Sequence, residues 1–222
     1  MKRPSRSEVG KEDFIRALKE GSEELGIKLG EEQLEAYESY YFELLRWNQK
    51  KSLTSITAPK EVAVKHFLDS LSLSPLIPEG VEVLDIGPGA GFPGLALKVF
   101  RRDLRLVLLE ASFKKVAFLR HMVRLLSLEG VEVVHGRAED LKGELGGHFR
   151  VVVSRALGPL EGLLSLGLPF VSEKGVLIAM KGPNWEKEWP CQGHTKARLN
   201  KVIEYQLPFS MGRRVLLVFS KA

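Results

Sequence analysis

The residues with the clearest chemical signature are the glycines at Gly87, Gly89 and Gly91, within the segment DIGPGAGFPG that spans Asp85–Gly94. Glycine adopts positive φ readily and lets the backbone approach a ligand closely. An apolar run precedes this segment and a helical pattern follows it, so the sequence predicts a strand, a glycine turn and a helix. Such a turn can hold a nucleotide-like cofactor, although the match of residues 89–94 to G-x-G-x-x-G is weak by itself.

Two carboxylates narrow the choice of cofactor. Asp85 stands two residues before Gly87, where it would repel a pyrophosphate but attract the cationic amino group of S-adenosylmethionine, directly or through water. Glu110 ends the next expected strand, where a carboxylate can accept hydrogen bonds from both ribose hydroxyls of an adenosyl cofactor. The spacing of Glu110 suits nicotinamide and methyl-donor sites alike, so Asp85 is the residue that favours a methyl donor. Either carboxylate could instead cap a helix or pair with a lysine.

Four further candidates follow the later strands of the expected sheet. Ala138 and Glu139 come after the third strand, where a backbone N–H and a short acceptor could contact the adenine edge. Arg155 follows the fourth strand and Lys181 the fifth. A cation beside a sulfonium is unfavourable, so these two are expected to face the cofactor carboxylate, an RNA phosphate or the substrate base. Judged alone, each is more often an ordinary surface cation.

The elements that must position these residues follow from apolar periodicity. Helical spacing marks residues 14–25, 33–50 and 64–71, and it predicts a helical N-terminal segment over residues 1–78. Strand and helix patterns then alternate over residues 79–222, which predicts a parallel sheet covered by helices. The expected strands are 81–86, 104–109, 131–134, 149–154 and 175–180, and the expected helices are 93–100, 113–128 and 159–170.

The chain ends in two more strand patterns, residues 201–207 and 214–220, joined as a hairpin. An antiparallel hairpin that completes a mostly parallel seven-stranded sheet is typical of class I, Rossmann-like methyltransferases and counts against a dinucleotide dehydrogenase. The fold class predicted is therefore α/β, with an N-terminal helical extension.

Composition limits the partners. The 222 residues carry a formal net charge of +5, and residues 181–222 hold 8 Lys/Arg against 3 Asp/Glu. This basic excess suits a nucleic-acid partner, although many basic proteins bind none. No apolar run approaches a membrane span, the first residues lack a secretory signal, and the single Cys191 cannot form an internal disulfide. We therefore expect a cytoplasmic protein that contacts no membrane. We expect no metal site, because no His/Cys cluster has the spacing of metal ligands. The default expectation for the oligomeric state is a monomer.

Several short segments, spread over most of the chain, stand out together. They are Trp47-Asn48, LTSI at 53–56, HFLDSL at 66–71, residues 84–94, KKVAFLR at 114–120, RAE at 137–139, SRA at 154–156 and KG at 181–182. With these segments the chain resembles the bacterial glucose-inhibited-division protein B family of 16S ribosomal RNA guanine-N7 methyltransferases.

The resemblance implies a class I fold, S-adenosylmethionine as methyl donor, and N7 of a guanine in 16S small-subunit ribosomal RNA as acceptor. It places cofactor contacts at Gly87, Phe92, Ala138, Glu139 and Arg155. The sequence departs from the family pattern at two positions. Lys65 stands where Arg is expected, and Lys lacks the planar guanidinium that can bind a phosphate through two hydrogen bonds. Glu110 stands where Asp is usual.

The expected chemistry needs no catalytic base. Guanine N7 presents a free lone pair at neutral pH, so methyl transfer requires in-line positioning only. The absence of a His/Asp dyad is therefore uninformative, and Arg155 and Lys181 are hypotheses for placing the base or the RNA. The residues alone leave open a small-molecule methyltransferase, a nicotinamide-linked oxidoreductase and a non-catalytic nucleotide-binding module. They also leave open the modified nucleotide, and whether free RNA or an assembled subunit is the substrate.

Overall fold

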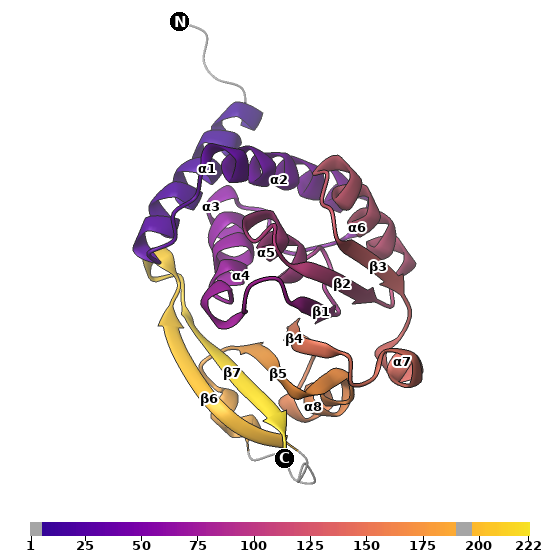
Figure 1. Ribbon diagram of the computed structural model, residues 1–222. Coiled ribbons are helices and arrows are strands. Elements are labelled where there is room, and N and C mark those ends of the chain that lie inside the picture. The colour runs from indigo at the N-terminus through magenta and orange to yellow at the C-terminus, as the bar shows by residue number, and fades with distance from the viewer. Residues whose placement is uncertain (1–5, 190–196) are drawn as a thin grey trace, which may run out of the picture.

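Helices open the chain in the computed structural model, which describes residues 6–189 and 197–222 and so leaves Cys191 outside (Figure 1). Helix α1 spans Arg6–Glu24 and α2 spans Glu31–Lys51. A third helical stretch consists of α3 Pro59–Val62, a π-helical segment Ala63–Leu68 and α4 Asp69–Leu71. All three were predicted. The first and third begin earlier than expected: polar residues extend α1 beyond its apolar stripe, and α3 adds a short turn that begins at Pro59 and buries Val62.

The remaining chain forms one seven-stranded sheet in the order β3-β2-β1-β4-β5-β7-β6. The strands are β1 Glu82–Ile86, β2 Arg105–Glu110, β3 Val131–His135, β4 Phe149–Arg155, β5 Val171–Lys181, β6 Ala197–Gln206 and β7 Arg213–Lys221. Strands β1 to β5 are parallel, whereas β7 is antiparallel to both β5 and β6. The predicted mostly parallel sheet with a C-terminal hairpin is confirmed.

Four helices connect the strands: α5 Gly94–Phe100, α6 Phe113–Leu125, α7 Ala138–Leu145 and α8 Leu160–Gly167. The sequence did not predict α7, because its eight residues offer only Leu141 and Leu145 as large apolar positions. Strand β6 begins at Ala197, four residues earlier than expected. It is an edge strand with a largely exposed face, so apolar alternation marks it poorly. Short 3₁₀ segments occur at Ser74–Leu76, Leu168–Phe170, Trp185–Glu188 and Pro208–Ser210.

Both faces of the sheet are buried, in two separate cores. Alternate residues of β1 divide between them: Val83 joins the core beneath α1–α6, and Leu84 joins the core beneath α7 and α8. The first core also contains Phe14, Tyr40 and Phe67 of the N-terminal helices, so these helices complete the core on this face of the sheet, where α2 packs on α5 and α6. Within the described residues, no helix has the length and apolarity needed to cross a bilayer.

Two tyrosines join helix α2 to the loop and helix that follow β1. The Tyr37 hydroxyl donates to the Ala96 carbonyl at 2.9 Å, and the Tyr40 hydroxyl donates to the Ala90 carbonyl at 2.7 Å. Both tyrosines are 0% exposed, so neither carbonyl has water as an alternative partner. Burial accordingly raises the pKa of Tyr40 well above its ordinary value. The N-terminal helices thus contribute hydrogen bonds to the region of the predicted site.

Replacing Tyr40 by Phe should destabilise the protein by about 1–3 kcal/mol, because the buried Ala90 carbonyl loses its donor. Urea unfolding measures this change. Ser39→Ala is the matched control, since Ser39 lies on the exposed side of the same helix and should change stability by less than about 0.5 kcal/mol. Equal stability of the two variants would contradict the role assigned to Tyr40.

Candidate functional site

The turn after β1 is held in a conformation that requires glycine. Gly87, Gly89 and Gly91 have φ of 70°, 60° and 90°, the left-handed region that residues with a Cβ rarely adopt. Space is also restricted: a Cβ on Gly91 would lie 2.0 Å from the Tyr40 hydroxyl oxygen, and one on Gly87 would lie 2.8 Å from Leu157 Cδ1. The predicted strand, glycine turn and helix are therefore present.

This turn borders a cavity of about 320 Å³ at the edge where the parallel strands end. Its walls come from the ends of β1, β2 and β4, from the β3–α7 turn, and from α6 and α8. The lining residues are Ile86, Gly87, Leu109, Glu110, Ala111, Lys115, Gly136, Arg137, Ala138, Glu139, Ala156, Leu157 and Leu166. Four predicted site residues, Gly87, Glu110, Ala138 and Glu139, are thereby brought together.

Glu110 connects the turn to this cavity. One of its carboxylate oxygens accepts a hydrogen bond from the Gly89 backbone N–H at 3.0 Å, and the other accepts from the Ser112 N–H at 2.8 Å. The side chain is 5% exposed. A carboxylate has about four lone-pair sites, so two remain for a ligand in the cavity. Glu110, which stands where the family pattern has Asp, therefore still places a carboxylate at the cavity wall.

The opposite wall begins at helix α7. Ala138 and Glu139 are its first two residues, and they leave backbone N–H groups at the helix start for hydrogen bonding. Arg137 and Lys115 also line the cavity, and neither was predicted as a site residue. Both lie within motifs that carry the family resemblance, RAE and KKVAFLR, but membership of a motif does not distinguish a cation that lines a cavity from a solvated one.

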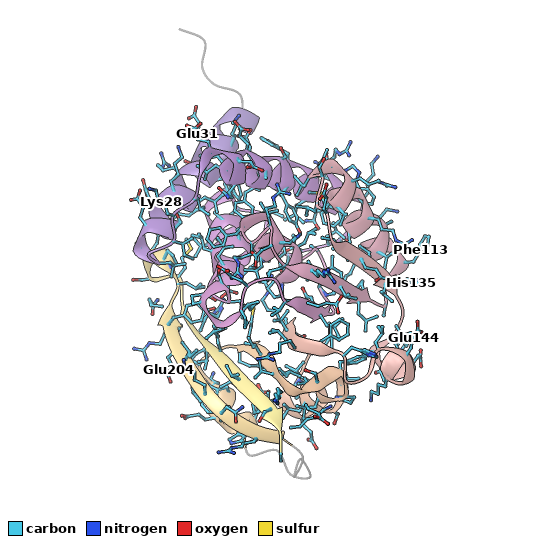
Figure 2. The ribbon with its side chains drawn as sticks, viewed as in Figure 1. Lys28, Glu31, Phe113, His135, Glu144 and Glu204 are labelled. Atoms are coloured by element: carbon cyan, nitrogen blue, oxygen red, sulfur yellow. The ribbon has the colours of Figure 1, made fainter. Side chains whose placement is uncertain are left out.

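Exposed rings lie beside this wall. Figure 2 shows Phe113 and His135 together at the surface, where α6 begins and β3 ends. The Phe113 side chain is 70% exposed, and its ring centroid lies 5.8 Å from that of His135 in an edge-to-face contact. Both rings lie outside the lining of the cavity, although His135 Nε2 lies 3.2 Å from the carbonyl oxygen of Ala111, which is a lining residue.

Asp85 lies beneath the turn and is not among the residues that line the cavity. Its Oδ2 accepts a hydrogen bond from the Gly94 N–H at 2.7 Å, at the start of α5. Its Oδ1 is buried and has no hydrogen-bond partner within the described residues. Burial raises the Asp85 pKa to about 7; the Gly94 hydrogen bond and Arg155 oppose this effect, and Glu110 adds to it. Asp85 can thus act on a ligand in this cavity through its charge but not by direct contact.

Phe92 and Arg155 face the N-terminal helices rather than the cavity. The Phe92 ring stacks between Tyr40 and His66, with centroid distances of 5.4 and 4.6 Å. The Arg155 guanidinium donates to the Lys65 carbonyl at 2.8 Å and pairs with Asp69 Oδ2 at 3.2 Å. These contacts fix the end of β4 against the π-helical segment.

His66 is held neutral by burial and by its contacts with Arg155 and Thr54. Its Nδ1 lies 3.2 Å from an Arg155 guanidinium nitrogen, which can only donate. Nδ1 must therefore accept, and Nε2–H donates to Thr54 Oγ1 at 2.9 Å. Burial, and secondly the Arg155 charge, lower the His66 pKa to about 3.

Lys181 forms its contacts with residues near the end of β5 and the loop after β4. Its Nζ donates to the Gly158 carbonyl at 2.8 Å and pairs with Glu188 at 2.7 Å. Glu188 in turn accepts from the Leu160 N–H at the start of α8. Lys181 therefore fixes the loop after β4, and it does not line the cavity that contains Glu110. Within residues 6–189 and 197–222, no group of three His, Cys, Asp or Glu could hold a metal ion.

The strand order, the glycine turn after β1 and the acidic end of β2 define a class I methyltransferase fold. The structure is similar to that of a protein described as a predicted O-methyltransferase from Agrobacterium tumefaciens, with a TM-score of 0.58, 19% identity, and coverage of 70% of this chain and 79% of that one. It is also similar to an S-adenosylmethionine-dependent methyltransferase from Aquifex aeolicus, with a TM-score of 0.53, 20% identity, and coverage of 72% and 93%.

Sequence comparison shows the family. The model of the family described as rRNA small subunit methyltransferase G matches residues 33–217. A relative from Caldanaerobacter subterraneus subsp. tengcongensis, named Ribosomal RNA small subunit methyltransferase G, is 45% identical over 218 residues, which cover 95% of this chain and 91% of that relative. The chain belongs to the rRNA small subunit methyltransferase G family, which confirms the resemblance drawn from its motifs.

The neutrality of His66 predicts a pH dependence of stability. The unfolded chain binds a proton near pH 6.5 and the folded state only near pH 3. Stability from this residue is therefore complete above about pH 6.5 and is lost as the pH falls. Between about pH 7.5 and pH 5.5, the stability of the parent protein relative to His66→Gln, measured by urea unfolding, should fall by about 1.4 kcal/mol. Comparing the two proteins cancels the opposite contribution of Asp85, whose raised pKa favours the folded state at lower pH.

His148→Gln is the control for this experiment, because His148 is an exposed residue and its replacement should retain the pH dependence of the parent protein. A His66→Gln variant whose stability follows the parent at both pH values would show that His66 is not held neutral.

Proposed function

We propose that this protein transfers the methyl group of S-adenosylmethionine to N7 of a guanine in small-subunit ribosomal RNA. Family membership supports the methyltransferase activity on this RNA. The single structural observation that carries the cofactor assignment is the cavity at the strand ends, with Glu110 on one side of it and the start of α7 on the other. The choice of N7 rests on the family resemblance and on the chemistry of that atom.

The residues of the cavity fit an adenosyl cofactor. The two free lone-pair sites of the Glu110 carboxylate suit ribose hydroxyls, and the backbone at Ala138 and Glu139 suits the adenine edge. Gly87 lines the cavity, and the space where a Cβ of Gly89 would stand is open, so the backbone of this turn can approach the methionine part closely. When bound, the cofactor supplies an electrophilic methyl group that needs only an aligned nucleophile.

Phe92 and Arg155 contact the N-terminal helices on the side of the turn that faces away from the cavity. We propose that Phe92, stacked on Tyr40 and His66, keeps the turn in place, and that Arg155 holds the end of β4. Their contacts, and those of Lys181 with Glu188, favour positioning roles within the protein. Direct placement of the base or the RNA by Arg155 or Lys181 stays a prediction.

The biological setting follows from the proposed substrate. A protein that modifies small-subunit ribosomal RNA works where that RNA is assembled, so we propose the cytoplasm as its location. A monomer and a boundary between residues 78 and 79 stay predictions. The packing of Tyr37 and Tyr40 on the loop and helix after β1 gives the N-terminal helices a role in the cofactor site in addition to any contact with RNA.

The direct test incubates the protein and labelled S-adenosylmethionine with small subunits, or their isolated RNA, from cells that lack the enzyme. We expect label in the RNA at a guanine that mass spectrometry and N7-specific strand cleavage identify. Glu110→Ala should reduce cofactor affinity at least about tenfold, since a buried charge-assisted contact is lost. Label on another atom of the RNA would exclude N7 while retaining the family activity.

The raised pKa of Asp85 predicts that cofactor binding is linked to the release of protons. A cationic ligand favours the ionised carboxylate, and without ligand the Asp85 pKa is about 7. Binding of S-adenosylmethionine should therefore release protons near pH 7, and its affinity should rise by up to about tenfold from pH 6 to pH 8 and then level off. Calorimetry in two buffers of different ionisation enthalpy measures the protons released.

Adenosine, which lacks the cationic amino group, is the control ligand and should release fewer protons. The Asp85→Asn variant, checked for folding by its melting temperature, should show no such release. Cofactor affinity that is independent of pH in the parent protein would contradict the electrostatic role of Asp85.

A further inference from the structure

A second cavity, of about 430 Å³, lies on the same edge of the sheet as the proposed cofactor site. It is formed where β6 ends and β7 begins, and Val215 in its wall pairs with Lys181 at the end of β5. In the strand order β4-β5-β7, this cavity is two strands from the end of β4, or about 10 Å. That distance is short enough for neighbouring nucleotides of one RNA strand to reach both places.

The side chains in this cavity offer the groups that recognise an unpaired nucleotide. They are two guanidinium groups, an aromatic ring, an amide and two carboxylates, from Arg213, Arg214, Tyr205, Gln206, Glu186 and Glu204. Guanidinium groups bind phosphate, and amide and carboxylate groups pair with base edges. Figure 2 shows Glu204 on the outer strand of the hairpin.

Arg213 is available for a ligand. Its side chain is exposed and forms no ion pair with any residue in the described part of the chain. Arg214 is held differently, since its Nε lies 3.6 Å from Asp69 Oδ1. The two arginines therefore separate into one cation free to bind phosphate and one that forms part of the wall.

The wall itself is preorganised. The Tyr205 hydroxyl donates to Asp69 Oδ1 at 2.7 Å and accepts from the Ser72 hydroxyl at 2.9 Å. The other oxygen of Asp69 accepts from Arg155 at 3.2 Å. Burial raises the pKa of Tyr205, so the phenol stays neutral and adds no charge against a phosphate. One buried carboxylate thus connects the second cavity to the end of β4 beside the cofactor site.

We propose that this cavity binds an unpaired nucleotide next to the target base in the RNA substrate, with Arg213 on its phosphate. The inference rests on the proposed function, because it assigns the acceptor strand to this edge of the sheet. The carboxylates of Glu186 and Glu204 favour a nucleotide whose base donates N–H groups, and they oppose an acidic protein segment of several charges. The site therefore contributes affinity for RNA and none for the methyl donor.

The test compares Arg213→Glu with Lys221→Glu, which make the same charge change at opposite ends of β7, both at exposed positions. Fluorescence anisotropy with a labelled single-stranded RNA gives the dissociation constant over a range of salt concentrations, and the methylation assay gives the KM for ribosomal RNA. Arg213→Glu should weaken RNA binding at least about fivefold more than Lys221→Glu and should reduce the salt dependence. Arg213→Lys should restore part of the loss, and calorimetry should show the same S-adenosylmethionine affinity in all variants.

Equal effects of Arg213→Glu and Lys221→Glu on RNA binding and on KM would overturn the proposed nucleotide site, whatever the activity of the parent protein. The proposed function would fail separately if the parent protein methylated no small-subunit RNA. In that case, a selective loss of RNA binding in Arg213→Glu would still support the site. Melting temperatures establish that both variants are folded.

Discussion

The turn after β1 is closed by hydrogen bonds of its own backbone, but its position on the sheet depends on neighbours from distant parts of the chain. The Glu110 carboxylate binds the Gly89 N–H from the side of β2, and the Tyr40 hydroxyl binds the Ala90 carbonyl from the side of α2. Three glycines with positive φ are thereby held between one acceptor and one donor. Any change in how α2 packs on α5 would move the backbone that borders the cavity, so the N-terminal helices help to position the candidate site.

Buried polar groups follow a consistent arrangement beneath this edge. Asp69 accepts from Tyr205 and Arg155, and Arg155 also keeps His66 neutral. Removing one partner from such a buried network destabilises the protein, because it leaves a charge uncompensated, whereas the complete network is rigid. Asp85 is the exception, because its Oδ1 has no partner among the described residues and its pKa is raised. An arrangement with one unsatisfied negative group beneath a ligand turn is better suited to a cationic ligand than to an anionic one.

The sequence predicted those parts of the site that depend on local pattern. The glycine turn, the acidic end of β2 and the residues Ala138 and Glu139 after β3 were predicted because strand ends and glycine spacing mark them directly, although helix α7 itself was not. The partners of Arg155 could not be predicted, since Lys65 lies 90 positions before it and no periodicity connects them. Tyr40 was missed for a related reason: a phenol on the buried face of a helix has the pattern of a core residue, and only the fold shows what its hydroxyl contacts.

The reversal of β7 has a consequence for the chemistry of the whole edge. Parallel strands bring their carboxyl ends to the ligand side, whereas an antiparallel strand brings its first residues there. Strand β7 begins with Arg213 and Arg214, so its reversal adds two guanidinium groups to an edge that already presents Lys115 and Arg137. Arg214 lies 3.6 Å from Asp69, whereas Arg213 forms no ion pair in the described part of the chain, so Arg213 is the cation of β7 that suits an RNA phosphate. One sheet edge can therefore offer a carboxylate, Glu110, at the donor cavity and an unpaired guanidinium at the cavity proposed for the acceptor strand.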